Sequence, residues 1–320
     1  MVADLGEAIG LDIGGTKILG VRAARDGTVL DRVEAATPAE DQAATLEAMV
    51  VAARRLMTLD VLAVGVGAAG MVDVANGILR FAPNLAWRDL AIAEHMQEAL
   101  GVPCQLDNDA NVAAYGEFRF GAGRGYRHLL LVAVGTGIGG GIIIDGRLFR
   151  GANGYAAEIG HVVVDPLGPP CGCGNLGCWE QVASGATIGR LGRETARAQP
   201  SSAMVALAGG DLDAVTGPLV TRAALDGDPA AIGVLGSVGV RLGIGIAGLV
   251  NVLDPQVVVV GGGAVAAGEL LLEPARVAFH DAVEGSSRRP KVPIVAAQLG
   301  NDAGAVGAAA LALEELGRLP

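Results

Sequence analysis

A histidine and three cysteines lie close together in the middle of the chain. They form an H-x9-C-x-C-x4-C pattern, which consists of His161, Cys171, Cys173 and Cys178. Zn²⁺ in closed structural sites prefers four nitrogen and sulfur ligands arranged as a tetrahedron. The surrounding residues are rich in Gly and Pro, a composition that is typical of a loop. The pattern therefore predicts a Cys3His zinc site that holds the loop 158–180 in shape.

Two carboxylates flank this loop. Glu158 comes three residues before the histidine, and Glu180 comes two residues after the last cysteine. Surface glutamates are usually solvated, and that is one interpretation of both residues. Their positions on either side of the expected metal favour a second interpretation, in which the loop also forms one wall of an active site.

Two glycine-rich turns, at residues 12–17 and 135–141, each lie between two expected strands. Backbone N–H groups in such turns can approach an anion closely, because no Cβ intervenes. Ordinary hairpin turns are the alternative interpretation. A third glycine run at 261–263 favours phosphate binding, since one isolated glycine motif would be a weak signal.

The first turn also carries side chains that suit a nucleotide. Asp12 ends the first strand and offers a carboxylate for Mg²⁺, usually through water. Thr16 or Lys17 could contact a terminal phosphate. A formal dinucleotide fingerprint, Gly65-x-Gly67-x-x-Gly70, is rejected because a hairpin follows it instead of the helix that would bind the phosphates.

A general base is expected at the start of a helix that runs to Phe120. Asp107, Asn108 and Asp109 precede this helix, and short polar side chains are good N-cap groups. Phosphoryl transfer to a hydroxyl needs a carboxylate within hydrogen-bond reach, and Asp109 is the candidate. In the alternative interpretation Asp109 is only the N-cap, although Asp107 could serve as the cap instead.

The remaining pattern predicts an alternation of strands and helices. The chain begins as an antiparallel meander with a hairpin turn at Asp26-Gly27. Expected helices cover 40–57, 90–100, 182–198, 203–225 with a break near Gly209, 229–253 and the residues after 301; expected strands cover 61–66, 104–106, 129–134, 256–260 and 292–296. The order strand, glycine turn, strand occurs at 9–21 and again at 129–144, which indicates two duplicated lobes.

Composition excludes several classes of partner and compartment. The 320-residue chain has a net charge of −11, a pI of about 4.8 and no basic stripe, which argues against nucleic acid. No uninterrupted apolar segment of membrane length and no signal peptide are found, so no membrane partner is expected. Three of the four cysteines belong to the loop, and Cys104 is interpreted as a buried small residue. This usage indicates a reducing, cytoplasmic location.

Several motifs together resemble the ROK family of sugar kinases, and within it the bacterial glucokinases. They are Asp12-x-Gly-Gly-Thr-Lys17, Asn108-Asp109, Gly135-Thr-Gly, Glu158-Ile-Gly-His161 and Cys171-Gly-Cys173-Gly-x-x-Gly-Cys178-x-Glu180. The resemblance extends through essentially the whole chain. It implies an α/β fold of the actin-like, ribonuclease-H-like type, with two lobes and a cleft for ATP and sugar. The expected lobes are a small one at 1–108, joined by the C-terminal helix 301–320, and a large one at 109–300.

The resemblance also implies roles for individual residues. Asp109 would activate the sugar 6-hydroxyl. Sugar-binding groups would be Gly67, Asn84, Asn108, Asp109, Glu158, His161 and Glu180. Nucleotide-binding groups would be Asp12, Gly14, Gly15, Thr16, Lys17, Gly135, Thr136, Gly137, Gly262, Gly263 and Ala264. The cofactors would be ATP, catalytic Mg²⁺ and structural Zn²⁺, in a homodimer or homotetramer.

The expected reaction is the ATP-dependent phosphorylation of glucose at the 6-hydroxyl. Alternatives within the class are kinases for mannose, N-acetylmannosamine, N-acetylglucosamine or fructose. A sugar-sensing transcriptional regulator is disfavoured, because the first glycine turn begins at residue 12 and the net charge opposes DNA binding. A catalytically inactive sugar-binding module would be expected to lack Asp109 or the first turn, and both are present.

Overall fold

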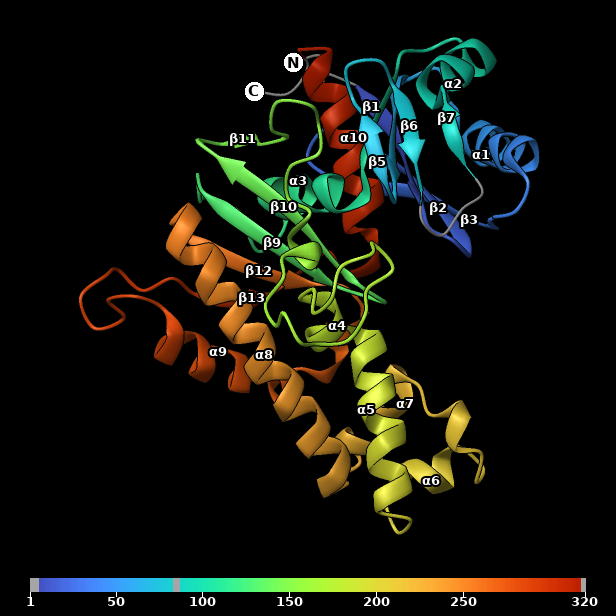
Figure 1. The fold of residues 1–320 in the computed structure, drawn as a ribbon. Coiled ribbons are helices and arrows are strands. Elements are labelled where there is room, and N and C mark those ends of the chain that lie inside the picture. Colours follow the sequence, from blue (N-terminus) through green and yellow to red (C-terminus); the bar gives the residue numbers. More distant parts are fainter. Residues whose placement is uncertain (1–5, 83–86, 318–320) are drawn as a thin grey trace. The chain divides into compact units, whose positions relative to one another are not determined.

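The computed structural model describes residues 6–82 and 87–317. Two compact units divide the chain (Figure 1). Unit 1 contains Met1–Arg127, Gly141–Ala157 and Gln298–Pro320, and unit 2 contains His128–Gly140 and Glu158–Ala297. The first boundary therefore follows Arg127 and not residue 108, where the sequence predicted it. The reason is that the helix after residue 108 packs closely on the C-terminal helix, which is also in unit 1.

Unit 1 is built on a five-stranded sheet of order β3-β2-β1-β4-β8. The strands are β1 (Glu7–Ile13), β2 (Lys17–Ala24), β3 (Val29–Ala36), β4 (Val61–Ala68) and β8 (Cys104–Asn108). The predicted antiparallel meander is confirmed for β1 to β3, while β4 lies parallel to both β1 and β8. A small antiparallel sheet adds β5 (Met71–Asp73), β6 (Ile78–Phe81) and β7 (Arg88–Leu90).

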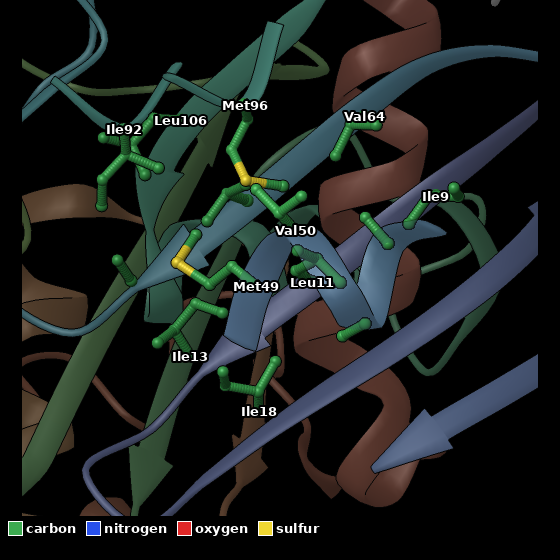
Figure 2. Close-up of a cluster of buried hydrophobic side chains, with 14 of the residues drawn as sticks. Ile9, Leu11, Ile13, Ile18, Met49, Val50, Val64, Ile92, Met96 and Leu106 are labelled. Carbon is green, nitrogen blue, oxygen red and sulfur yellow. The ribbon is translucent and has the colours of Figure 1, made fainter. Parts of the chain in front are cut away.

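Helices cover both faces of this sheet. One face carries α1 (Gln42–Leu56) and α2 (Ile92–Leu100), which bury a core with the alternate side chains of β1 and β4 (Figure 2). The other face carries α3 (Asp109–Phe120) and α10 (Ala303–Glu315). Gly10 and Gly65 let α10 approach, since a Cβ there would lie 1.7 Å from the carbonyl oxygen of Ala305 and 1.9 Å from that of Ala308.

Unit 2 is organised around a sheet of order β11-β10-β9-β12-β13, in which β10 crosses from unit 2 into unit 1 at Gly141. The strands are β9 (Leu129–Val134), β10 (Ile138–Ile144), β11 (Arg147–Leu148), β12 (Val257–Gly261) and β13 (Ile294–Ala296). The helices are α4 (Glu180–Ala183), α5 (Gly185–Ala198), α6 (Ala203–Leu207), α7 (Gly217–Leu225), α8 (Pro229–Leu253) and α9 (Glu269–Ala282). Parallel pairing of β9 with β12 brings the ends of these strands to one edge.

Helix α8 is the longest element of unit 2 and the most apolar. By length and composition alone it could cross a membrane, with a mean hydropathy of 1.8, although Arg241 interrupts its apolar sequence. Half of that apolar window is buried inside the structure. The helix packs along α9 and also against α5 and α7 (Figure 1). Core helices of globular proteins share these properties, so α8 is weak support for a membrane span.

Candidate functional site

The polar residues of unit 1 meet where three parallel strands end. Register places Asp12 of β1 beside Gly67 of β4, and Gly67 beside Asp107 of β8. Asp109 follows directly as the first residue of α3. Gly67 is required here because a Cβ would lie 2.5 Å from Cγ2 of Val112 on the same helix. The structure thus brings Asp12, Gly67 and Asp109 together at the carboxyl ends of neighbouring strands, where ligands of α/β sheets commonly bind.

The N-cap of α3 is Asn108, and neither of the neighbouring aspartates takes that place. Its Oδ1 accepts hydrogen bonds from the backbone N–H groups of Ala110 and Asn111, and its Nδ2 donates to the carbonyl oxygen of Gly70 at 3.1 Å. The Asn108 side chain also hydrogen-bonds to the carboxylate of Asp109. Asp109 is therefore not needed as the N-cap, and its Oδ1 accepts the Ala110 N–H at 2.9 Å.

Asp107 has a structural role that the sequence did not reveal. Its buried carboxylate accepts from Nε of Arg150 at 2.6 Å, from Nδ2 of Asn111 at 2.9 Å and from the Asn108 N–H at 2.8 Å. These contacts hold the start of α3 and the segment 141–157 together within unit 1. The sequence Asp107-Asn108-Asp109 alone does not indicate which of the two aspartates forms these structural contacts.

The first glycine turn is closed and its tip is exposed. The Gly14 N–H donates to the carbonyl oxygen of Lys17 at 2.9 Å, and Oγ1 of Thr37 donates to the carbonyl oxygen of Gly14 at 2.8 Å. Gly15 is partly buried, while Thr16 and Lys17 are exposed. Lys17 pairs with Glu34 at 3.2 Å on the surface, a weak contact that a phosphate could displace.

Two aspartates in unit 1 have raised pKa values. Burial, followed by the negative charge of Asp109, raises the pKa of Asp12 to about 7, against a smaller opposing effect of Lys17. Burial also raises the pKa of Asp109, although its hydrogen bond from the Ala110 N–H acts in the opposite direction. Paired carboxylates of this kind favour a bound cation and supply a base that is strong near neutral pH.

We expect Asp12→Asn to stabilise the protein at alkaline pH in the absence of Mg²⁺ and nucleotide. Because the folded chain retains a proton on Asp12 that the unfolded chain has released above pH 3.8, wild-type stability falls as the pH rises to about 7. Solvent access to this partly buried group reduces the effect, so we expect a gain of about 1–3 kcal/mol at about pH 8 and little change near pH 4.

Thermal unfolding of the wild type and the variant across this pH range measures the difference. Asp26→Asn is the matched control, since Asp26 lies exposed in the β2–β3 turn and accepts from the Thr28 N–H. That control should lose a little stability. An Asp12→Asn variant that unfolds at a lower temperature than wild type at every pH contradicts the expectation.

The second glycine turn and the third glycine run lie at one edge of the unit 2 sheet. Gly135 to Gly137 follow β9, Gly262 to Ala264 follow β12, and these strands are parallel neighbours. The carbonyl oxygens of Gly135 and Thr136 accept from the N–H groups of Gly185 and Ala186, which fixes the turn to the start of α5. Gly262 has φ +81°, which favours glycine. Residues expected to bind nucleotide are therefore brought together within unit 2.

The predicted metal ligands converge. The ligand atoms of His161, Cys171, Cys173 and Cys178 all lie within 4.8 Å of one another. Nδ1 of His161 is 3.6 Å from Sγ of Cys171, and the Sγ atoms of Cys173 and Cys178 are 3.5 Å apart. One imidazole and three thiols are the donor set of a structural zinc site, so the residues fit Zn²⁺. These four side chains would hold it, and Nε2 of His161 would remain for another partner.

The thiols differ in acidity. Burial raises the pKa values of Cys171 and Cys178, whereas the Asn175 N–H lowers the pKa of exposed Cys173 to about 7. Because zinc binds thiolates, binding would release protons from the two buried thiols.

Glu180 links the cysteine cluster to the second glycine turn. Its Oε1 is 3.1 Å from Sγ of Cys171 and 3.9 Å from Nδ1 of His161. Its Oε2 would lie 2.4 Å from a Cβ on Gly137, so the turn approaches this carboxylate closely only because residue 137 is glycine. Glu180 is thus partly buried beside the predicted metal and the predicted phosphate turn, which argues against a solvated surface charge.

The two remaining sugar-binding candidates are placed differently. Glu158 is exposed and follows Ala157, whose φ of +70° lies in the left-handed region that non-glycine residues rarely adopt. Such strain is often found next to functional residues. Asn84 lies outside the described residues.

The comparisons with known proteins agree with this arrangement. Residues 8–315 match the profile of the ROK family. The glucokinase of Streptomyces coelicolor is 41% identical to this chain, covering 97% of it and 98% of the relative. The glucokinase of Halalkalibacterium halodurans is 37% identical and covers 93% and 92%. A crystal structure of a ROK family glucokinase from Streptomyces griseus in complex with glucose and AMPPNP superposes with a TM-score of 0.89 at 42% identity, covering 97% and 100%. The expected actin-like α/β fold class is confirmed.

Proposed function

Since the chain belongs to the ROK family, we propose that it is a glucokinase, which transfers the γ-phosphoryl group of ATP to the 6-hydroxyl of glucose. The observation that carries the proposal is Asp109. This carboxylate is the first residue of α3, is relieved of capping by Asn108 and has a pKa raised by burial. A base for a sugar hydroxyl needs these properties.

The proposal assigns a separate part of the chemistry to each group of residues. Asp109 removes the proton from the 6-hydroxyl as the phosphoryl group arrives. Asp12 would hold Mg²⁺, which neutralises phosphate charge when it is bound. The backbone N–H groups of the turns at 14–17 and 135–137 bind the phosphates, and the 262–264 segment lies beside the nucleoside.

Sugar selection rests on groups that match individual hydroxyls. The carboxylates of Glu158 and Glu180 accept hydrogen bonds, and Nε2 of His161 and the side-chain amide of Asn108 donate them. Asn84 and the backbone at Gly67 are proposed as further contacts. A site of this kind discriminates strongly, because an epimer leaves a buried polar group without a partner.

A panel of sugars and phosphoryl donors tests the proposal. Glucose, mannose, fructose, N-acetylglucosamine and N-acetylmannosamine are each combined with ATP or polyphosphate, and the product is identified. We expect glucose with ATP to give the highest kcat/KM and glucose 6-phosphate as the product. A preference of about tenfold or more for another sugar would replace glucose as the substrate. Absence of phosphorylation of every sugar would overturn the kinase assignment.

A cytoplasmic location and a homodimer or homotetramer complete the proposal. None of the four cysteines forms a disulfide, which supports a reducing compartment. The net charge of −11 argues against nucleic acid as a partner. Light scattering coupled to gel filtration measures the oligomeric state.

A further inference from the structure

Glu117 is a completely buried carboxylate in the middle of unit 1, with an exposed fraction of 0%. It lies on α3, two turns after Asp109. In the part of the chain that the structure describes, no Lys or Arg pairs with it. Burying a charge without a cation is costly unless several donors compensate it, so its surroundings should explain its presence.

Backbone N–H groups from two separate segments surround this carboxylate. Oε1 accepts from Leu299 at 2.7 Å, while Oε2 accepts from Ala122 at 2.8 Å and from Gln298 at 3.1 Å. The carbonyl oxygen of Glu117 accepts two more, from Gly121 at 3.0 Å and from Gly123 at 2.9 Å. Hydrogen bonds to a charged acceptor are among the strongest that proteins make.

Both segments lead to places where the chain passes between the units. The chain leaves unit 1 after Arg127 and returns to it at Gln298. Glu117 therefore binds the first two residues of the returning segment and the turn that precedes the departing one. This arrangement requires glycine at position 121, because a Cβ there would lie 2.0 Å from Oε2 of Glu117.

Glu117 also connects the elements that carry or contact Asp12 and Asp109. Residues 298 and 299 lead into α10, which lies alongside α3 (Figure 1). Near the start of α10, a Cβ on Gly304 would lie 2.5 Å from Oδ2 of Asp12. Glu117 thus links the helix that begins with Asp109 to the segment that leads to the helix packed against Asp12.

We propose that Glu117 is a positioning residue, which fixes the 121–127 and 298–302 segments to α3 and thereby sets the placement of Asp12 relative to Asp109. This inference rests on the proposed kinase function. Glu117 does not touch the substrate. It determines where two of the four connections leave unit 1 and holds α10 against the sheet.

Glu117→Gln tests this role, because the amide keeps the size of the side chain but directs an N–H₂ group at backbone donors. We expect kcat for glucose phosphorylation to fall by about tenfold or more, with the Kd for ATP changed less than about threefold. Peptide-level hydrogen exchange should increase at 121–127 and 298–302. Glu117→Asp, which keeps the charge on a shorter side chain, should give intermediate values for both.

Thr45→Ala is the matched control for a loss of stability alone. Thr45 is completely buried in unit 1 and donates to the carbonyl oxygens of Pro38 and Asp41, far along the chain from both segments. It should lower the melting temperature without altering kcat or exchange at these segments. If Glu117→Gln loses no more kcat than Thr45→Ala, or if exchange at the two segments stays at the wild-type level, the proposal is overturned. A wild-type protein without glucose kinase activity would reject the proposed function instead, and the exchange comparison would still decide whether Glu117 holds the segments.

Discussion

Asp109→Asn is expected to lower kcat by on the order of 10³-fold, which is within the usual contribution of a general base. Asparagine cannot take the proton of the 6-hydroxyl. It can still accept the Ala110 N–H through its side-chain oxygen, and Asn108 still caps α3. The fold should therefore persist, and the Kd for glucose should change by less than about fivefold. A coupled ADP assay measures kcat, and calorimetry measures sugar binding.

Asp107→Asn is the informative neighbour for comparison. It carries the same chemical change two residues away, in a carboxylate that is paired with Arg150 at 2.6 Å. Breaking a buried ion pair costs about 3–5 kcal/mol, so this variant should lose stability more than turnover. If Asp109→Asn keeps more than about a tenth of wild-type kcat, Asp109 is not the base.

The sequence predicted much of the local structure correctly because its signals are local. Helical periodicity located α1 within two residues, and α8 matches the predicted 229–253 in full. The predictions of the Asp26-Gly27 turn and of the metal ligands also use only residues that are close together in the sequence. The helical segment predicted at 203–225 with a break near Gly209 consists of α6, a 3-10 turn at Leu212–Ala214 and α7, so the break is confirmed and is longer than expected. Gly209 and Gly210 both adopt positive φ, which ends α6.

Features that depend on distant contacts could not be predicted. Nothing in the triplet Asp107-Asn108-Asp109 shows that the first aspartate pairs with Arg150, the asparagine caps the helix and the second aspartate remains available. Glu117 looks like an ordinary exposed residue of a helix until residues 298 and 299 are placed beside it. The boundary after Arg127 has the same origin, because it depends on the packing of α3 against α10.

Removal of zinc is expected to raise the KM for glucose by about tenfold or more while the Kd for ATP stays within about threefold. The loop has few other constraints. Ile159 and Trp179 are buried near its two ends, but Val162, Val163, Val164 and Leu167 between them are exposed, so little apolar burial holds the middle of the loop. Its backbone pairing is limited to the isolated bridges Val163↔Cys178 and Pro170↔Leu176 and a few turns. Without the metal, His161 and Glu180 lose the framework that fixes them.

Two treatments measure this effect, chelation followed by dialysis and the variant Cys178→Ser, which removes one ligand. Elemental analysis should find about one zinc per chain before treatment, as expected for a single four-ligand set. Cys104→Ser is the control, because Cys104 lies in β8 outside the cluster. It should keep both the metal and the KM.

The nucleotide comparison decides what the metal does. Gly262 to Ala264 follow β12 and Gly135 to Gly137 follow β9, so the sheet holds both segments. The Gly185 and Ala186 N–H groups also fix the 135–137 turn, which Glu180 of the loop approaches at Gly137. If the metal shapes only the loop residues that bind the sugar, its removal should leave these two nucleotide-binding segments unchanged. Equal losses of sugar and ATP binding would instead mean that the metal stabilises unit 2 as a whole. A metal-free chain with an unchanged KM for glucose would show that zinc has no role in sugar binding.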